Sequence, residues 1–313
     1  MEGRPLGATG ISVSHVILGC GNFGGIGSAP AFFGQGESQE EAFALLDAAR
    51  ERGITTLDTA DAYGGGRSES FIGEWLRSRR VPRDEVVLST KVYNPMDAGL
   101  DEGLAPERIR RQIEGSLRRL GVEHVDLYLT HAPDPETPLE ETLAAMDELV
   151  AAGKVRAVGA SNVDAETLRA GLATYRWVQN PYSLLDREAE TEVLPLCAEQ
   201  GLGFTPFSPL AGGLLTGKYR RDEPPPPGSR MATRPEMAEH LDKERVYAAV
   251  DRLGELAARV GADRPTLALA WLFEQPLVTA VVIGPRRPEH LEPALRALDL
   301  RLDDALLGEL DAV

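Results

Sequence analysis

The sequence predicts an α/β protein built on a (β/α)8 barrel, or TIM barrel, with long loops at the C-terminal face of the strands. Short apolar runs alternate with amphipathic stretches, which is the pattern of βα units around a parallel sheet. Eight strands separated by helices favour a closed barrel over an open sheet, and we expect residues 1–313 to form a single domain. The apolar runs occupy residues 16–20, 54–58, 86–92, 125–131, 155–161, 177–183, 203–208 and 279–284.

Amphipathic helices are expected between these runs, and several of them end on a glycine, as helices often do. These glycines are Gly53, Gly121, Gly153 and Gly201. The expected helices span residues 39–52, 68–80, 106–120, 138–152, 165–172, 188–200 and 243–260.

Three long connections, 23–37, 93–104 and 220–230, follow the first, third and seventh apolar runs. All three would emerge at the carboxyl ends of the strands, where barrel active sites lie. The stretch RRDEPPPPGSR at 220–230 cannot form a helix, because proline fixes φ and lacks a backbone donor. It is either a mobile lid over the active site or an insertion without that role.

Composition excludes several classes of function. A net charge of −16 argues against a nucleic-acid surface, which needs clustered lysine and arginine. The first twenty residues lack the pattern of a signal peptide, and no apolar stretch reaches the roughly 18 residues that span a bilayer. Cys20 and Cys197 have no metal or disulfide spacing, and the histidines show neither HxH nor HExxH. We expect a cytoplasmic protein without a metal; the oligomeric state stays open.

Polar side chains end several of the predicted strands and would meet at the mouth of the barrel. Asp58, Lys91 and His131 end the second, third and fourth runs, and Tyr63 follows Asp58 on the next loop. Singly, each has an ordinary structural interpretation, such as a turn cap or an ion pair. Together they would place titratable groups in one cavity, which costs stability unless they serve chemistry.

The chemistry that these groups permit is proton donation to a carbonyl oxygen. A tyrosine with its usual pKa near 10 is a weak acid, but the ammonium of Lys91 would lower that pKa. Asp58 would offset the lysine charge, and His131 would hydrogen-bond the carbonyl oxygen. The reaction also needs a hydride, for which a nicotinamide is the natural donor.

An ordered series of motifs extends over nearly the whole chain: LGATGISVSHVILGCGNFGG, LDTADAYGGGRSE, LSTKV, DLYLTHAPDPETPLEETLAAMDELVAAGKVRAVGASN, VQNPYSLLD, FSPLAGGLLTGKY and VVIGPRRPEHLE. In this order the motifs resemble the aldo-keto reductases. The resemblance implies reduction of an aldehyde or ketone by a nicotinamide cofactor. Asp58, Tyr63, Lys91 and His131 fall on the family's catalytic tetrad, with Tyr63 as the general acid.

The resemblance also implies a set of cofactor-binding residues. Arginines in the adenosine-phosphate segment suit a 2′-phosphate, because guanidinium pairs with phosphate in a bidentate way. We therefore expect NADPH to be preferred, with NADH possible. The implied residues are Ser161, Asn162 and Gln179 for the carboxamide, Phe207 for ring stacking, Ser208, Pro209, Leu210, Gly212 and Lys218 for the pyrophosphate, Arg230 from the following loop, and Gly284, Arg286, Arg287 and His290 for the adenosine phosphate.

The chain departs from the family pattern at a few positions. Pro293 and Ala294 stand where many members contact the adenine through Glu and Asn, which leaves the strictness of the NADPH preference open. Gly21 replaces an aromatic substrate-facing residue, which implies a wider or differently shaped pocket. No feature of the sequence identifies the substrate. The candidates for lining its pocket are Phe23, Phe32, Phe33, Tyr93, Ala132 and Tyr182.

Two alternatives remain open on the sequence alone. Some relatives of the family bind cofactor and serve an ion channel, so a regulatory subunit with little turnover is one of them. A lyase that uses Lys91 as a Schiff-base nucleophile is the other. The neighbouring Asp58 argues against the lyase, because an imine-forming lysine must lose its proton.

Overall fold

A computed structural model describes residues 3–99, 101–238 and 242–313, and its central feature is one sheet of eight parallel strands. The strands pair in the order β10-β3-β4-β5-β6-β7-β8-β9, and each predicted apolar run contains one of them. Their bounds are β3 (Val16–Gly19), β4 (Thr56–Asp58), β5 (Val87–Val92), β6 (Val125–Thr130), β7 (Val155–Ser161), β8 (Trp177–Gln179), β9 (Gly203–Phe204) and β10 (Val281–Ile283).

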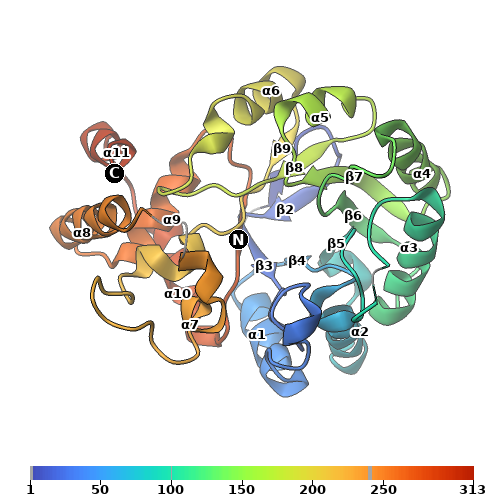
Figure 1. Ribbon diagram of the computed structural model, residues 1–313, viewed down its shortest axis with the longest axis horizontal. Coiled ribbons are helices and arrows are strands. Elements are labelled where there is room, and N and C mark those ends of the chain that lie inside the picture. Colours follow the sequence, from blue (N-terminus) through green and yellow to red (C-terminus); the bar gives the residue numbers. More distant parts are fainter. Residues whose placement is uncertain (1–2, 100, 239–241) are drawn as a thin grey trace.

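The sheet curls until its two edge strands approach each other. The backbone N–H of Thr279 donates to the carbonyl of Phe204, and that of Val282 donates to the carbonyl of Pro206, both at 2.9 Å. The helices lie around the outside of the strands (Figure 1). This arrangement is consistent with the predicted (β/α)8 barrel.

All seven predicted helices are present, while α7, α9, α10 and α11 were not predicted. In α9 the eight residues 266–273 are all buried, so its sequence shows no polar stripe to reveal a helix. The α-helices are α1 (Gln39–Glu51), α2 (Arg67–Ser78), α3 (Pro106–Leu120), α4 (Leu139–Ala151), α5 (Ala165–Ala170), α6 (Val193–Gln200), α7 (Arg230–Thr233), α8 (Lys243–Arg259), α9 (Arg264–Glu274), α10 (Glu292–Asp299) and α11 (Asp304–Asp311). Short 3₁₀ helices are η1 (Pro30–Phe32), η2 (Tyr63–Gly65), η3 (Arg83–Glu85), η4 (Glu188–Glu190), η5 (Ala211–Thr216), η6 (Pro235–Ala238) and η7 (Pro288–Leu291).

The helix ends follow the local sequence. Gly121 and Gly201 end α3 and α6 with φ of 70° and 65°, a backbone conformation that glycine adopts without strain. At the start of α1, Ser38 and Glu41 form a reciprocal capping box. These local signals explain why the predicted helix bounds lie close to the observed ones.

The N-terminal hairpin was not predicted. β1 (Gly3–Pro5) and β2 (Ser12–Ser14) pair antiparallel, and the buried side chains of Leu6, Ile11 and Val13 pack into the cluster inside the strands. The hydroxyl of Ser14 accepts a hydrogen bond from the backbone of Thr56 at the start of β4. The hairpin therefore covers the amino ends of the strands, opposite the ends that carry the candidate site.

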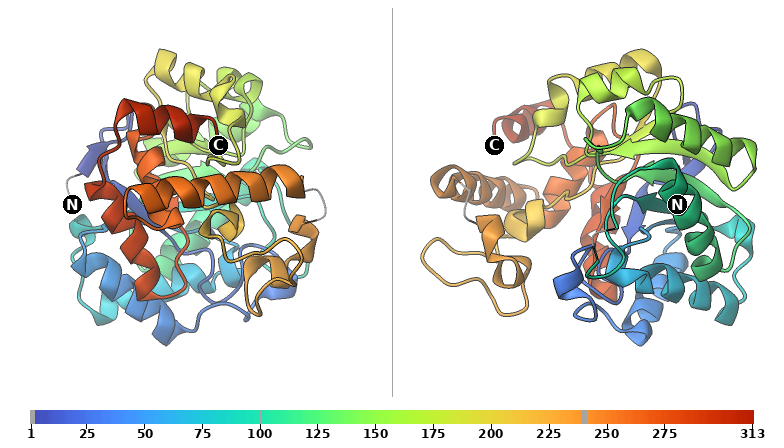
Figure 2. Two further views of the ribbon diagram at one scale, coloured as in Figure 1. Left: turned by 90° about the vertical axis from the view of Figure 1, so that its left-hand side faces the viewer. Right: turned by 45° about the vertical axis from the view of Figure 1, so that its right-hand side comes forward.

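The carboxyl ends of β3, β5 and β9 lead into the segments 20–38, 93–105 and 205–242. Gly19, the last residue of β3, forms a GxGxxG string with Gly21 and Gly24, and such a string is typical of a dinucleotide-binding turn. No helix follows it directly, since α1 begins only at Gln39, so the string does not form such a turn. The segment 220–229 is without helix or strand and projects from the body of the protein in the right-hand view of Figure 2, and residue 230 begins α7.

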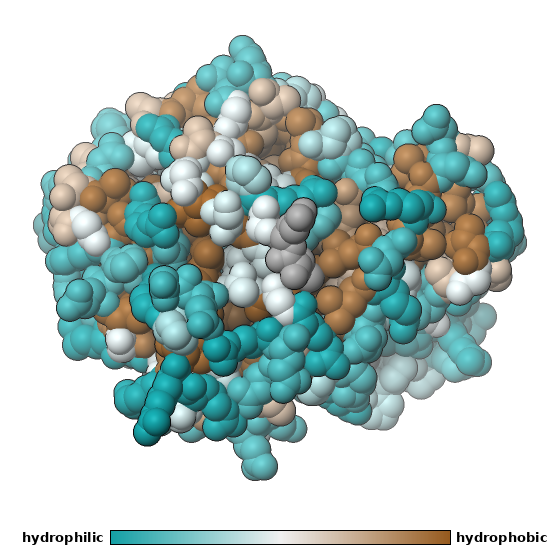
Figure 3. All heavy atoms as spheres, turned by 180° about the vertical axis from the view of Figure 1, so that it is seen from behind, coloured by the Kyte–Doolittle hydropathy of each residue, from teal (hydrophilic) through white to brown (hydrophobic). Residues whose placement is uncertain are grey.

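The surface is mostly polar. In the described part of the chain, the large hydrophobic side chains that are exposed are Val150 in α4, Val260 directly after α8 and Leu277 after α9. On the face drawn in Figure 3, hydrophobic residues are interspersed among hydrophilic ones. None of the described helices combines the length and the apolar character needed to cross a bilayer.

Candidate active site

A buried ion pair lies at the carboxyl ends of β4 and β5. The Nζ of Lys91 is 2.5 Å from the Oδ2 of Asp58, and the side chains are 1% and 5% exposed. The ammonium also donates to the carbonyl of Thr59 at 2.9 Å. Ser89 and Gln179 donate to the other carboxylate oxygen of Asp58, at 3.0 and 3.1 Å. The carboxylate is therefore hydrogen-bonded on both oxygens, which fixes the position of the lysine.

Tyr63 and His131 lie beside this pair. Tyr63 begins η2, and His131 directly follows β6. The hydroxyl of Tyr63 is 3.4 Å from Nε2 of His131, and the two rings meet edge to face. The Nζ of Lys91 is 5.1 Å from the centre of the Tyr63 ring. The four predicted tetrad residues, which are up to 73 positions apart in the sequence (131 − 58), thus lie together.

The electrostatics differ from the prediction in one respect. Burial raises the pKa of Tyr63, and the opposing charge of Lys91 is too weak to bring that pKa below its usual value. The predicted decrease in the pKa of Tyr63 took only the charge of Lys91 into account. Burial of the tyrosine has the opposite and larger effect. Burial alone would lower the pKa of Lys91. The charges and hydrogen bonds of Asp58 and Tyr63 have a larger effect and raise this pKa, so the lysine stays charged. For His131, burial and then the charge of Lys91 hold the pKa well below the usual range, so the ring is neutral.

Asn94 belongs to this group and was not predicted. Its Nδ2 lies 3.0 Å from Nδ1 of His131, the ring nitrogen that faces away from Tyr63. Asn94 lies two residues beyond the end of β5, on a loop, so the search for polar residues at strand ends did not find it. The sequence YNP after the strand is only a weak indication of a functional residue, since it is also typical of an ordinary turn.

A second buried acid, Asp61, follows Asp58 by three residues, and its backbone N–H donates to the carbonyl of Lys91 at 3.1 Å. Asp61 is fully buried, and neither carboxylate oxygen has a hydrogen-bond partner within the described part of the chain. Burial, with a smaller contribution from Glu69, raises the pKa of Asp61 to about 8. The folded protein therefore holds a proton that the unfolded chain releases above a pH of about 4.

Replacing Asp61 by Asn should remove this proton uptake. Because the folded pKa is the higher one, Asp61 lowers the free energy of unfolding progressively as the pH rises from about 4 to about 8. We expect Asp61→Asn to raise the melting temperature at pH 8 and to leave it nearly unchanged at pH 4. Thermal melts across this range test it, with the exposed Glu51→Gln as control. An equal change at both pH values would contradict a raised pKa.

The residues predicted to hold a nicotinamide carboxamide lie on two adjacent strands. Ser161 pairs with Gln179 in the register of β7 and β8, both are buried, and the Gln179 amide donates to Asp58. Asn162 has a positive φ of 57°, which is uncommon outside glycine, and its amide donates to the carbonyl of His131. A hydroxyl and two amides next to the tetrad suit a carboxamide group, which offers both donors and acceptors.

The predicted stacking and pyrophosphate residues lie after β9. Phe207 is half-buried against the interior cluster. Ser208 and Ala211 have positive φ values of 54° and 47°, and such backbone strain is common at ligand sites. The remaining predicted residues of this segment are the buried Pro209, the half-buried Leu210 and Gly212, and the exposed Lys218.

The two predicted phosphate arginines differ in their surroundings. Arg286 donates to the buried carboxylate of Glu37 at 2.7 Å and to the carbonyl of Gly228 at 2.9 Å. It thereby joins the segments after β3, β9 and β10. Arg287 is 72% exposed, with its nearest described carboxylate, on Glu289, at 3.8 Å. A 2′-phosphate could therefore approach Arg287 more readily than Arg286.

The other residues predicted near the adenosine lie around these arginines. Gly284 and His290 are exposed, and Nδ1 of His290 accepts a hydrogen bond from the backbone of Arg286. Arg230 begins α7, and burial lowers its pKa. Ala294 is buried in α10, so its side chain packs in the core.

Two of the predicted substrate-lining residues are buried in the hydrophobic core. Phe23 is buried in the main core cluster. Tyr182 packs against Phe204 and Trp271, and its hydroxyl donates to Glu190 at 2.6 Å. These two aromatic side chains pack against neighbouring elements. The half-buried Phe32, Phe33, Tyr93 and Ala132 remain candidates.

Gly21 lies against the tyrosine of the tetrad. A Cβ at this position would be 3.6 Å from the Tyr63 ring, which is ordinary van der Waals contact. The missing side chain therefore leaves space beside Tyr63, as the departure from the family pattern implied.

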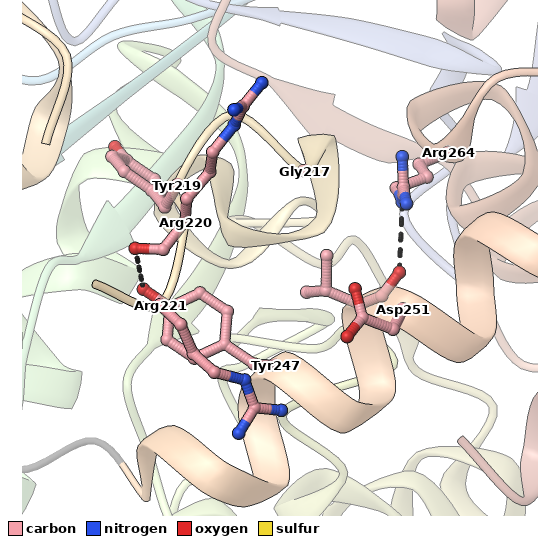
Figure 4. A pocket seen from close by; sticks show the side chains of 8 residues that line it. Gly217, Tyr219, Arg220, Arg221, Tyr247, Asp251 and Arg264 are labelled. Carbon is pink, nitrogen blue, oxygen red and sulfur yellow. Dashed lines mark hydrogen bonds between the residues drawn. The ribbon is translucent and has the colours of Figure 1, made fainter. Parts of the chain in front are cut away.

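A polar cavity of about 410 Å³ lies elsewhere, between η5, α8 and α9 (Figure 4). Its wall includes three arginines, and Arg264 donates to the carbonyl of Val250 while Tyr247 donates to that of Arg220. None of the tetrad residues lines it. Among the described residues, no group of three or more His, Cys, Asp or Glu side chains is placed to bind a metal.

Comparisons with known proteins identify the family of this chain. The model of the "Aldo/keto reductase family" matches residues 16–313. An uncharacterized oxidoreductase of Bacillus subtilis, YrpG, is 38% identical over 100% of this chain and 96% of its own. The NADH-specific methylglyoxal reductase of Escherichia coli is 37% identical over 97% and 96%. A probable voltage-gated potassium channel subunit beta of rice (Oryza sativa subsp. japonica) is 33% identical over 100% and 96%.

One curled sheet of eight parallel strands with helices around it places the protein in the α/β class and is consistent with a (β/α)8 barrel. With the family match over nearly the whole chain, the protein belongs to the aldo/keto reductase family. It is an NAD(P)H-dependent oxidoreductase that acts on carbonyl or CH–OH groups.

Proposed function

We propose that this protein is a cytoplasmic aldo-keto reductase whose 313 residues form a single (β/α)8-barrel domain, and that it reduces an aldehyde or ketone to an alcohol with NADPH. The observation that carries the proposal is the convergence of Tyr63 and His131, at 3.4 Å, beside the buried Lys91–Asp58 pair. These groups could donate a proton and polarise a carbonyl.

Each residue of the tetrad has one role in this proposal. Tyr63 is protonated at neutral pH because its pKa is raised, so it donates its proton to the carbonyl oxygen. The Lys91 ammonium stabilises the phenolate that remains, and Asp58 holds the lysine in place. Neutral His131 donates a hydrogen bond to the same oxygen and orients the carbonyl.

The chain offers a donor set that fits a nicotinamide dinucleotide. Ser161, Asn162 and Gln179 would hold the carboxamide, and Phe207 would stack on the ring. Backbone groups after β9, together with Lys218, would meet the pyrophosphate, and cations there oppose a protein charge of −16. When bound, the nicotinamide supplies the hydride that no side chain provides. The segment 220–230 would act as a lid, held by the contact of Arg286 with Gly228.

The preference for NADPH can be tested at Arg287. Removing its guanidinium should raise the Kd of NADPH about ten- to hundredfold, because a charge-assisted hydrogen bond contributes about 1.5–3 kcal/mol. The Kd of NADH should stay nearly constant. Nucleotide fluorescence titrations of Arg287→Ala measure both. Arg301→Ala, which removes a guanidinium that is 87% exposed, is the matched control. Equal weakening of both nucleotides would contradict a 2′-phosphate contact.

A regulatory subunit with little turnover is a second candidate, because relatives named as probable potassium channel beta subunits are 33% and 31% identical to this chain. All four tetrad residues are present here and lie together, which favours the enzyme. Steady-state turnover of a small aldehyde separates the two. A turnover that Tyr63→Phe leaves unchanged would favour the regulatory role.

The Schiff-base lyase is disfavoured by the ion pair. The 2.5 Å contact with Asp58 keeps the amine of Lys91 protonated, and a protonated amine cannot attack a carbonyl. Borohydride treatment in the presence of an aldehyde should therefore leave the mass at Lys91 unchanged.

A further inference from the structure

The two ring nitrogens of His131 face different partners. Nε2 faces the hydroxyl of Tyr63 at 3.4 Å, and Nδ1 faces the amide nitrogen of Asn94 at 3.0 Å. An amide NH₂ group can only donate a hydrogen bond, so the nitrogen that it meets must carry a lone pair. In a neutral imidazole the proton is then on Nε2.

Asn94 is itself held by a buried arginine. Its backbone carbonyl accepts from Nη2 of Arg108 at 2.8 Å, and the same guanidinium binds the carbonyls of Asp101 and Gly103. Arg108 belongs to α3 and is buried. The Arg108 guanidinium thus holds the loop after β5 against α3. This contact places the Asn94 amide beside His131.

We propose that Asn94 is a positioning residue that holds His131 as its Nε2–H tautomer. The proton on Nε2 then points to the place where a carbonyl oxygen would meet the Tyr63 hydroxyl. With the other tautomer, the ring would present a lone pair to that oxygen and repel it. The catalytic consequence rests on the proposed reductase function, whereas the tautomer itself does not.

The substitution Asn94→Asp tests the tautomer because it changes a donor to an acceptor at nearly constant shape. An ionised carboxylate draws the histidine proton to Nδ1. In ¹⁵N spectra of histidine-labelled protein, we expect an imine-type Nδ1 and a pyrrole-type Nε2 for His131 in the wild type. In Asn94→Asp, Nδ1 should become protonated. The signal is assigned by its loss in His131→Gln. A wild-type proton on Nδ1, or an unchanged spectrum in the variant, would overturn the proposal.

The kinetic arm of the test uses the same variant. Loss of one hydrogen-bond donor to the reacting oxygen should lower kcat about a hundredfold, while the Kd of NADPH stays unchanged. Asp97→Asn, an exposed change on the same loop, is the control and should keep kcat. An unchanged kcat in Asn94→Asp would contradict the positioning role.

A second variant covers the case in which Asn94→Asp does not fold. Asn94→Ala removes the donor without adding an acceptor, so His131 should show a mixture of both tautomers. A single Nε2–H form in that variant would mean that Asn94 does not select the tautomer. If the wild type binds nucleotide but reduces no aldehyde, the proposed function fails, and the spectra still decide the role of Asn94.

Discussion

Tyr63→Phe should lower kcat for aldehyde reduction by about three orders of magnitude. The phenylalanine ring can keep the packing against Lys91 and His131, but it has no proton to give to the carbonyl oxygen. Steady-state consumption of NADPH with a generic aldehyde measures the loss. The Kd of NADPH, from fluorescence titration, should change little, because the proposed nucleotide contacts lie on other residues.

Gly21→Ala is a suitable control for this result. Its added methyl group would touch the same tyrosine ring at 3.6 Å without removing the hydroxyl. We expect a modest change in KM for bulky aldehydes and a kcat within a few-fold of the wild type. If Tyr63→Phe were as active as Gly21→Ala, another group would have to supply the proton.

Breaking the Lys91–Asp58 pair should reduce stability as well as turnover. Lys91→Met leaves the Asp58 carboxylate buried with only Ser89 and Gln179 as its donors. Leaving one charge of a buried pair without its partner costs about 3–5 kcal/mol, and the two remaining donors place the expected loss near the lower end. Urea unfolding measures this loss, and kcat should become undetectable or nearly so because the phenolate of Tyr63 is no longer stabilised.

The double variant Lys91→Met with Asp58→Asn separates stability from catalysis. It removes both charges, so most of the lost free energy of unfolding should return, while kcat should stay low. Recovery of both properties would mean that the lysine serves the fold alone. A double variant no more stable than Lys91→Met would mean that the buried carboxylate is not the cause of the instability.

The fold could be predicted largely because buried parallel strands appear in the sequence as short apolar runs. The end of each run also places a side chain at the mouth of the barrel, which is why the sequence alone predicts Asp58, Lys91 and His131 to be neighbours. The N-terminal hairpin escaped prediction because its strands contain no apolar run: β1 (GRP) is exposed throughout, and β2 (SVS) has one apolar residue. Helix α9 escaped it because burial on nearly all sides leaves no amphipathic period.

The parts of the site that could not be predicted depend on contacts distant in sequence. The ion pair of Glu37 with Arg286 joins residues 249 positions apart, and no local pattern indicates it. Asn94 depends on the guanidinium of Arg108, which reaches it from α3. The packing of Tyr182 could not be predicted, because an aromatic residue in a loop has the same sequence pattern whether it faces a ligand or packs against a residue such as Trp271.

The central claim is that a hydride passes from a nicotinamide to a carbonyl carbon at the tetrad. The most direct measurement is the reduction of a small aldehyde with NADPH deuterated on the reactive face of its nicotinamide, followed by mass spectrometry of the product. We predict one deuterium on the carbinol carbon of the alcohol, formed by the wild type and almost absent with Tyr63→Phe. An alcohol without deuterium when either face is labelled, or no alcohol although NADPH binds, would contradict the account.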